Sequence, residues 1–267
     1  MFVQIIVFII LLVIGFFVFK TDPFKADTKK ISLAAIFVVL AVVLKRFSLM
    51  IPLFGFPSLQ VGFETLPLII GGMLLGPSYA FLIGMAVDVI GLVIAPNGFP
   101  FLGFTLNSVL RPLIPAIWMK HQCHFSEKQI IYGLYAGMLV LSIGASVYVC
   151  TLNSITVSKE IIMITSSIKI GTVLLCVGVS LLMILICQYL RKKLDAASQT
   201  DLLNWMVIVV VLEVFINFLL TPFWLQTMYG IPWIASLLIR ILKACIMVPL
   251  SIFIGYSCYE MIKRIVK

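Results

Sequence analysis

Residues 60–95 read QVGFETLPLIIGGMLLGPSYAFLIGMAVDVIGLVIA, two apolar runs that meet at Gly76-Pro77. A helix needs about 20 residues to cross the hydrocarbon core of a bilayer. We therefore expect two short spans here, about 60–75 and 77–95, joined by a tight turn at the Gly-Pro pair. Apolar runs of similar length lie on both sides, which predicts a membrane protein with several helices.

The composition supports this fold class. Of the 267 residues, 63% are hydrophobic and only 11% are charged, and the mean hydropathy is +1.22. Soluble domains carry about 25% charged residues, so this chain needs lipid as its solvent. We predict an all-α polytopic membrane protein of about nine spans. They are about 2–19, 31–53, 60–75, 77–95, 101–119, 129–150, 167–190, 203–222 and 232–262.

The basic residues predict the orientation of these spans. No basic residue precedes the run 2–19 and no small-residue cleavage site follows it, so it is a retained span rather than a signal peptide. With the N-terminus outside, 12 of the 19 Lys and Arg residues fall on the cytoplasmic side, as the positive-inside rule requires. The C-terminus is then on the cytoplasmic side. We expect the protein to lie in the cell membrane. The cytoplasmic basic residues are Lys20, Lys25, Lys29, Lys30, Lys120, Lys128, Arg191, Lys192, Lys193, Lys263, Arg264 and Lys267.

The sequence shows no signature of catalysis or of a cofactor. It contains no P-loop, no HExxH and no GxSxG motif. His121 and His124 flank Cys123 in a cytoplasmic segment, which we interpret as a solvated loop rather than a metal site. The six cysteines lie mostly inside apolar runs and have no CxxC spacing. The net charge of +9 belongs to membrane-anchoring loops, so we expect no nucleic-acid partner.

Ionisable residues inside spans are costly and commonly functional. They are Asp88, Arg111, Glu213, Arg240 and Lys243, and the last two share one helix face. One interpretation is internal pairing, for example of Asp88 or Glu213 with a cation. The other is that Arg240 or Lys243 meets an anionic ligand that enters from outside. Asn107 lies one turn before Arg111 and would join its polar cluster.

Three segments predicted on the outer side combine proline, aromatic and polar residues: 45–52, 96–101 and 221–226, with Tyr229-Gly230 following the last. They form either an interfacial aromatic belt or a pocket for a flat ligand. The second span also carries small residues, which pack inside the protein or form a docking face for a partner. These are Ala34, Ala35 and Ala41.

These segments resemble a known family. The motifs GGMLLGP at 71–77, DVIG at 88–91 and GFPFLGFT at 98–105 resemble the substrate-binding S components of energy-coupling-factor (ECF) vitamin transporters, with the folate-specific branch as the best match. The segment 217–243, with Pro249 beyond it, resembles the last two helices of that branch. The resemblance covers about 31–119 and 203–262.

The resemblance implies a six-helix core that captures a folate-like vitamin outside. A transmembrane coupling protein and two ATP-binding subunits would supply the energy, and the S component is thought to topple to release its cargo. Small residues of the first family helix would dock on the coupling protein, here Ala34, Ala35 and Ala41. Aromatic residues would stack the vitamin rings, and the basic and amide residues would meet its carboxylates or join the polar cluster. The candidate binding residues are Arg46, Phe63, Phe101, Phe104, Asn107, Arg111, Trp224, Tyr229, Arg240 and Lys243.

The chain departs from the family by three additional helices. We predict an extra N-terminal helix and linker in 1–30, family helices 1–4 in 31–119, an inserted pair in 120–202, and family helices 5–6 with a tail in 203–267. An even number of inserted spans preserves the orientation of the last two. Two alternatives stay open for the ligand and the class: another flat vitamin such as riboflavin, or a secondary transporter. A membrane enzyme is a third, although the in-span residues offer no convergent nucleophile or metal set.

Overall fold

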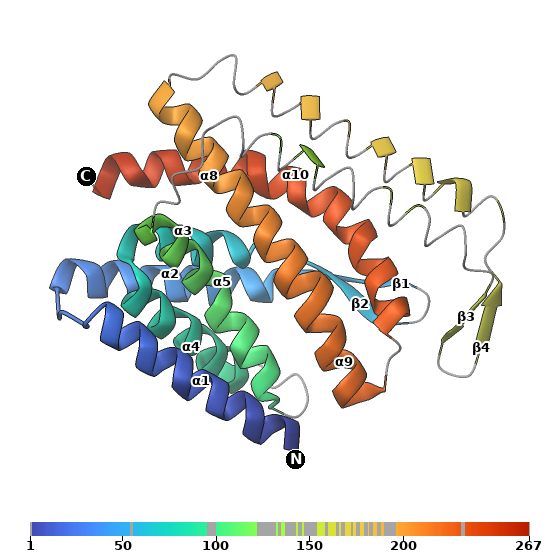
Figure 1. Cartoon of the computed structure of the whole chain (residues 1–267), viewed down its shortest axis with the longest axis horizontal. Coiled ribbons are helices and arrows are strands. Elements are labelled where there is room, and N and C mark those ends of the chain that lie inside the picture. The colour runs from blue at the N-terminus through green and yellow to red at the C-terminus, as the bar shows by residue number, and fades with distance from the viewer. Residues whose placement is uncertain are drawn as a thin grey trace. The chain divides into compact units, whose positions relative to one another are not determined.

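The computed structural model of the chain is helical, with two short hairpins (Figure 1). It describes residues 2–53, 56–94, 100–121, 154–157, 160–163, 196–230 and 233–266, and isolated positions between 132 and 189. Three of the described helical stretches are long and apolar enough to cross a membrane: Val3–Thr21, Pro77–Ile94 and Gln199–Met228. The predicted helical membrane protein is therefore confirmed, and the count of nine spans stays a prediction.

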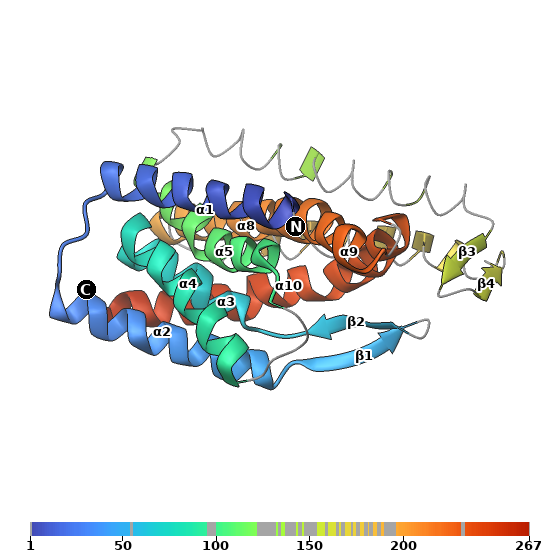
Figure 2. The ribbon, with the colours of Figure 1, turned by 90° about the horizontal axis from the view of Figure 1, so that it is seen from below.

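The chain divides into two compact units. Unit 1 comprises 1–49, 62–123 and 259–267, and unit 2 comprises 50–61 and 124–258. The helices of unit 1 are α1 (Phe2–Thr21), α2 (Thr28–Arg46), α3 (Thr65–Leu75), α4 (Pro77–Ile94) and α5 (Leu102–His121), with the last turns of α10. Helix α5 packs against α1, α3 and α4. Helix α4 lies between α1 and α2 (Figure 2).

Glycines allow α5 to approach its neighbours closely. A Cβ added to Gly72 of α3 would lie 2.0 Å from the backbone oxygen of Pro112. One added to Gly84 of α4 would lie 2.5 Å from the Cα of Val109. Such small residues are how helices gain contact in lipid, where the hydrophobic effect between helices is absent.

The expected turn between α3 and α4 is confirmed. Gly76 has φ +92°, a conformation that favours glycine, and its N–H donates to the carbonyl oxygen of Gly72 at 3.3 Å. Pro77 then opens α4, where its missing N–H costs nothing and its fixed φ suits the helix.

These short connections give unit 1 two distinct ends. The last turn of α2 lies near the last turns of α4, because a Cβ on Gly91 would be 3.4 Å from the Nζ of Lys45. We call this end, with the starts of α3 and α5, the Arg46 end. The opposite end holds the last turns of α1, α3 and α5 and the starts of α2 and α4. We call it the Lys120 end.

The predicted spans 31–53 and 60–75 are wrong at the ends that face each other. Helix α2 ends at Arg46, and Leu49–Leu53 (β1) and Phe56–Val61 (β2) form a two-stranded sheet. The hydroxyl of Ser48 donates to the carbonyl oxygen of Lys45 at 2.7 Å, which occupies an acceptor that a continuing helix would use. Strand pairing then satisfies the backbone of the apolar segment that follows.

Unit 2 contains a long helical stretch from α8 (Ala196–Leu212) through the π-helix η1 (Glu213–Leu220) to α9 (Thr221–Tyr229), and most of α10 (Trp233–Val266). The predicted end of the span 203–222, with an outer connecting segment at 221–226, is wrong. The helical stretch continues to Tyr229, because Pro222 stands in the first turn of α9, where proline is tolerated. The turn comes at Gly230, with φ +66°. The indole N–H of Trp233 donates to the carbonyl oxygen of Phe218 at 3.4 Å, an oxygen for which Pro222 has no N–H to offer.

Several predictions fall largely or wholly outside the described residues. These are the inserted spans 129–150 and 167–190, residues 96–99 of the segment 96–101, and the segment with Cys123 and His124. Between the two inserted spans, Ser154–Val157 (β3) pairs antiparallel with Glu160–Met163 (β4).

Candidate functional site

An ion pair joins two helices near the Arg46 end of unit 1. The guanidinium of Arg111 on α5 donates to the carboxylate of Glu64, which precedes α3, at 2.5 Å. The side chains are 21% and 14% exposed, so the pair is largely withdrawn from solvent. Arg111 therefore has a partner inside the protein, whereas the sequence analysis placed Arg111 among the candidate ligand-binding residues.

Aromatic candidates lie at the starts of α3 and α5, the two helices that this pair joins. Phe101 and Phe104, at the start of α5, meet edge to face with their ring centroids 5.8 Å apart, and Phe101 is buried. Phe63 immediately precedes Glu64 and is half-buried. Asn107 follows Phe104 by one turn of α5 and is 4% exposed. Phe63 and Asn107 are therefore within one residue and one helical turn of the two members of the ion pair, and Phe101 and Phe104 lie further toward the start of α5.

Asp88 is bound by hydroxyl groups and not by the cation that the internal-pairing interpretation offered it. Its carboxylate accepts hydrogen bonds from the hydroxyls of Thr105 at 2.7 Å and Ser108 at 3.3 Å, and all three side chains are buried. Glu213 in η1 likewise accepts from the amide of Asn217 at 2.7 Å. Among the described residues, Asp88 forms no ion pair, and its two hydroxyl donors on α5 link α4 to α5.

Arg46 closes α2 and is exposed, so its charge is available at the Arg46 end. The small residues of the same helix are divided. Ala35 is exposed and Ala34 half-buried, whereas Ala41 is fully buried within the protein. Only the first two present a surface that a partner protein can touch.

The remaining candidates belong to unit 2. Trp224 is buried in α9 and meets Phe223 edge to face at 5.0 Å. Arg240 and Lys243 lie one turn apart on α10 and are half-buried, and the Nε of Arg240 donates to the hydroxyl of Ser236 at 3.2 Å. The side chain of Tyr229 lies outside the described part of the chain.

Sequence reasoning missed Glu64. Its signal was present, because an acidic residue inside the apolar segment 60–75 satisfies the same criterion that singled out Asp88. Reading the ionisable residues of all spans in one pass would have offered Glu64 as a partner for Arg111.

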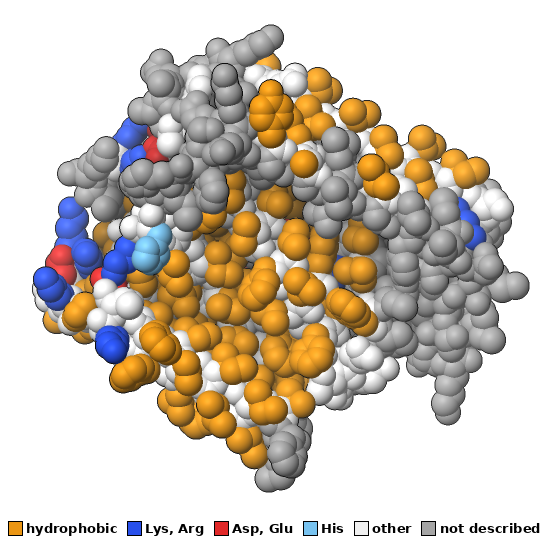
Figure 3. Space-filling view, viewed as in Figure 1, with side chains coloured by type: hydrophobic (Ala, Val, Ile, Leu, Met, Phe, Trp, Pro, Cys, Tyr) orange, Lys and Arg blue, Asp and Glu red, His pale blue; other side chains and the backbone are white. Residues whose placement is uncertain are grey.

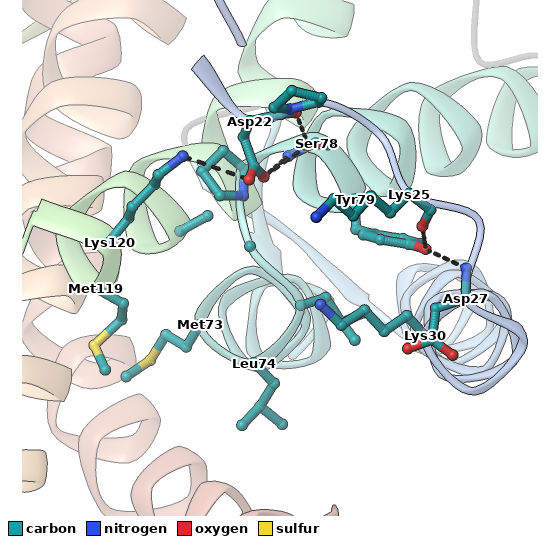
Figure 4. Close-up of a pocket in the computed structure, with 15 residues that line it drawn as sticks. Asp22, Lys25, Asp27, Lys30, Met73, Leu74, Ser78, Tyr79, Met119 and Lys120 are labelled. Carbon is teal, nitrogen blue, oxygen red and sulfur yellow. Dashed lines mark hydrogen bonds and ion pairs between the residues drawn. The ribbon is translucent and has the colours of Figure 1, made fainter. Parts of the chain in front are cut away.

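A cavity at the Lys120 end was also not anticipated (Figure 4). It has a volume of about 750 Å³ and is bounded by the α1–α2 linker, the α3–α4 turn and the end of α5. Its lining includes Lys25, Lys30, Leu74, Ser78, Tyr79 and Lys120.

Asp22 organises one wall of this cavity. Its carboxylate accepts from the Ser78 N–H at 3.1 Å and from the Ser78 hydroxyl at 2.7 Å, and lies 3.4 Å from the Nζ of Lys120. Burial raises the pKa of Asp22, but the hydrogen bonds from Ser78 and the charge of Lys120 outweigh it, so the net pKa is below the ordinary 3.8.

Comparison with known proteins places this fold. The family model described as "ECF transporter, substrate-specific component" matches residues 29–259. Two curated relatives are each described as "Folate transporter FolT". The one from Clostridium novyi is 26% identical over 114 residues, and the one from Leuconostoc mesenteroides subsp. mesenteroides is 33% identical over 98. These alignments cover 42% and 36% of this chain and 64% and 50% of the relatives' own length.

A solved structure, FolT bound with folic acid, is similar in fold. The TM-score is 0.51 at 20% sequence identity, covering 88% of this chain and 95% of that one. The family match spans most of the chain, so the resemblance read from the glycine and proline motifs is confirmed: this multi-pass membrane protein belongs to the substrate-specific components of ECF transporters, a family of transporter subunits rather than of enzymes.

Proposed function

We propose that this chain is the substrate-binding membrane subunit of an ECF-type importer for a folate-like vitamin. The observation that carries the proposal is the family match over residues 29–259. The description of both curated relatives as folate transporters supports the substrate class. The vitamin would be captured on the outer side and delivered through partners that hydrolyse ATP.

The Arg46 end of unit 1 is the proposed outer end. It combines aromatic faces from Phe63, Phe101 and Phe104 with charge from Arg46 and the Arg111–Glu64 pair. A pterin or benzoyl ring stacks on aromatic faces, and a glutamate carboxylate prefers a guanidinium. Trp224, Tyr229, Arg240 and Lys243 of unit 2 complete the proposed set, together with Asn107.

The finer architecture is part of the same proposal. It has a six-helix core, an extra N-terminal helix in 1–30 and an inserted pair in 120–202, which makes nine spans with the N-terminus outside. Ala34 and Ala35 on α2 are the proposed contacts with the transmembrane coupling protein, which two ATP-binding subunits would drive.

Ligand binding to the purified, detergent-solubilised chain tests this proposal without any partner subunit. Folic acid is titrated calorimetrically in the absence of ATP, with riboflavin as a flat vitamin of different chemistry and pteroic acid as a folate without its glutamate. We expect saturable binding of folic acid, weaker binding of pteroic acid and none of riboflavin. Binding of riboflavin alone would assign the chain to another vitamin.

Arg240 is the candidate to change first in unit 2. If its guanidinium meets a ligand carboxylate, Arg240→Ala lowers folate affinity by about tenfold or more. The matched control is Ser236→Ala, which removes the hydroxyl that Arg240 contacts and leaves the charge in place. Unchanged affinity of a folded Arg240→Ala protein would remove Arg240 from the site.

A further inference from the structure

The cavity at the Lys120 end has a surplus of positive charge. Lys25, Lys30 and Lys120 line it, against Asp22 and Asp27. Figure 4 shows the side chains of Lys25 and Lys30 running in the same direction past Tyr79, toward the space between Ser78 and Leu74. The Nζ of Lys30 lies 5.9 Å from the centre of the Tyr79 ring.

Both carboxylates of the cavity are already engaged at helix starts. Asp22 accepts from the N–H of Ser78 in the first turn of α4, and Asp27 accepts from the N–H of Lys29 in the first turn of α2 at 2.9 Å. Asp22 also faces Lys120. Within the part of the chain that the structure describes, no ion pair is formed by Lys25 or Lys30. Their charges are therefore available to a ligand.

The wall that carries these lysines is held in place. The hydroxyl of Tyr79 donates to the carbonyl oxygen of Lys25 at 2.6 Å and accepts from the N–H of Asp27 at 3.2 Å. The ring of Phe24 lies 5.1 Å from that of Tyr79, which is buried. Because the linker backbone is fixed at both points, little ordering would be needed when a ligand binds.

The rest of the lining is largely apolar. Met73, Leu74, Ala116 and Met119 contribute it. Figure 3 shows most of the visible Lys and Arg side chains at the end where the α1–α2 linker lies, next to a broad hydrophobic surface. A ligand with an anionic head and an apolar tail matches this combination.

We propose that the Lys120-end cavity binds the phosphate headgroup of an anionic lipid, with Lys25 and Lys30 as its contacts. The site uses the linker that follows α1, so it gives the additional N-terminal helix a role. Within unit 1 it lies at the opposite end from the proposed vitamin residues of that unit, and it does not depend on which vitamin is bound.

The test is thermal unfolding of the purified full chain in detergent, followed by tryptophan fluorescence and titrated with phosphatidylglycerol or with phosphatidylcholine of the same acyl chains. Inorganic phosphate is titrated separately. The site variant is K25Q/K30Q. The matched control is K20Q/K29Q, which removes two charges from the same stretch of chain, neither of which lines the cavity. K25R/K30R keeps the charge.

We expect phosphatidylglycerol to raise the unfolding temperature of the wild type, the K20Q/K29Q control and K25R/K30R, while phosphatidylcholine and phosphate leave it unchanged. K25Q/K30Q should need roughly thirtyfold more phosphatidylglycerol for the same shift, at about 1 kcal/mol per lysine. Equal responses of the two glutamine variants would show diffuse surface attraction and overturn the site. An equal response to phosphate would overturn the lipid as its occupant.

Discussion

Asp22 shows how one side chain can complete a helix to which it does not belong. Gly76, which precedes α4, has no side chain to accept from the first turn, and the carboxylate of Asp22 does so from the end of α1. Asp22→Ala, which removes the acceptor altogether, should lower stability at neutral pH by about 1 kcal/mol. Ser78→Ala is the control, because it keeps the backbone N–H and loses only the hydroxyl contacts.

The lowered pKa of Asp22 adds a pH dependence with a defined sign. A carboxyl whose folded pKa lies below its unfolded value of 3.8 stabilises the protein above that value, and the gain disappears as pH falls from 3.8 through the folded pKa. Unfolding temperatures measured between neutral pH and pH 3 should therefore converge for wild type and Asp22→Asn at the acid end. Parallel curves would contradict this assignment.

The Arg111–Glu64 pair separates a structural from a ligand-binding role. Arg111→Ala leaves the carboxylate of Glu64 without its cation in a largely buried site, which we expect to cost about 2 kcal/mol. The double variant Arg111→Met with Glu64→Gln should recover much of that loss. Folate affinity, measured on folded samples of both, should fall in the two alike if Arg111 also contacts the vitamin. Recovery of affinity in the double variant would contradict a ligand contact.

At the scale of elements, the tightest requirement is the contact of α3 and α4 with α5. Gly72→Ala places a methyl 2.0 Å from a backbone oxygen, and a backbone cannot move aside as a flexible side chain can. We expect a cost of about 3 kcal/mol or more, seen as a lower unfolding temperature or loss of the monodisperse protein in detergent. Gly171→Ala, whose added methyl meets no described atom within 4 Å, is the matched control and should have no such effect.

Helix limits were predictable where turn residues mark them. The turn at Gly76-Pro77, the limits of α4 and the turn at Gly230 agree with the glycine and proline signals. The hairpin at 49–61 was not predictable. Hydropathy measures apolar content and does not distinguish a backbone that pairs along a helix from one that pairs across a hairpin. Pro222 misled in the opposite way, because a proline in a first turn and a proline in a loop look alike in sequence.

The candidate site followed the same logic. Arg111 and Asn107 were recognisable from composition, since ionisable and amide groups in apolar runs stand out. Their partners were not, because the hydrogen bonds of Asp88 to Thr105 and Ser108 and the pairing of Arg111 with Glu64 depend on which helices become neighbours. Small hydroxyl residues are too common in membrane helices to single out by sequence.

At the scale of the whole molecule, the charge distribution predicts a cytoplasmic C-terminus. A fluorescent protein fused after Lys267 should fluoresce, since it folds in the cytoplasm, and alkaline phosphatase fused there should be inactive. Fusions within 96–100, on the predicted outer side, should give the reverse pattern. Active phosphatase at the C-terminus would mean that the number of spans is even or that the first segment is oriented differently.

The cap that Asp22 supplies to α4 also bears on whether α1 can move separately from the rest of unit 1. A helix that acted as a fixed membrane anchor would have to move independently of the helices that it anchors. Helix α1 has no such freedom, because its final turn and the residue after it are bonded to Ser78 and Lys120. We therefore expect any reorientation of unit 1 within the bilayer to include α1.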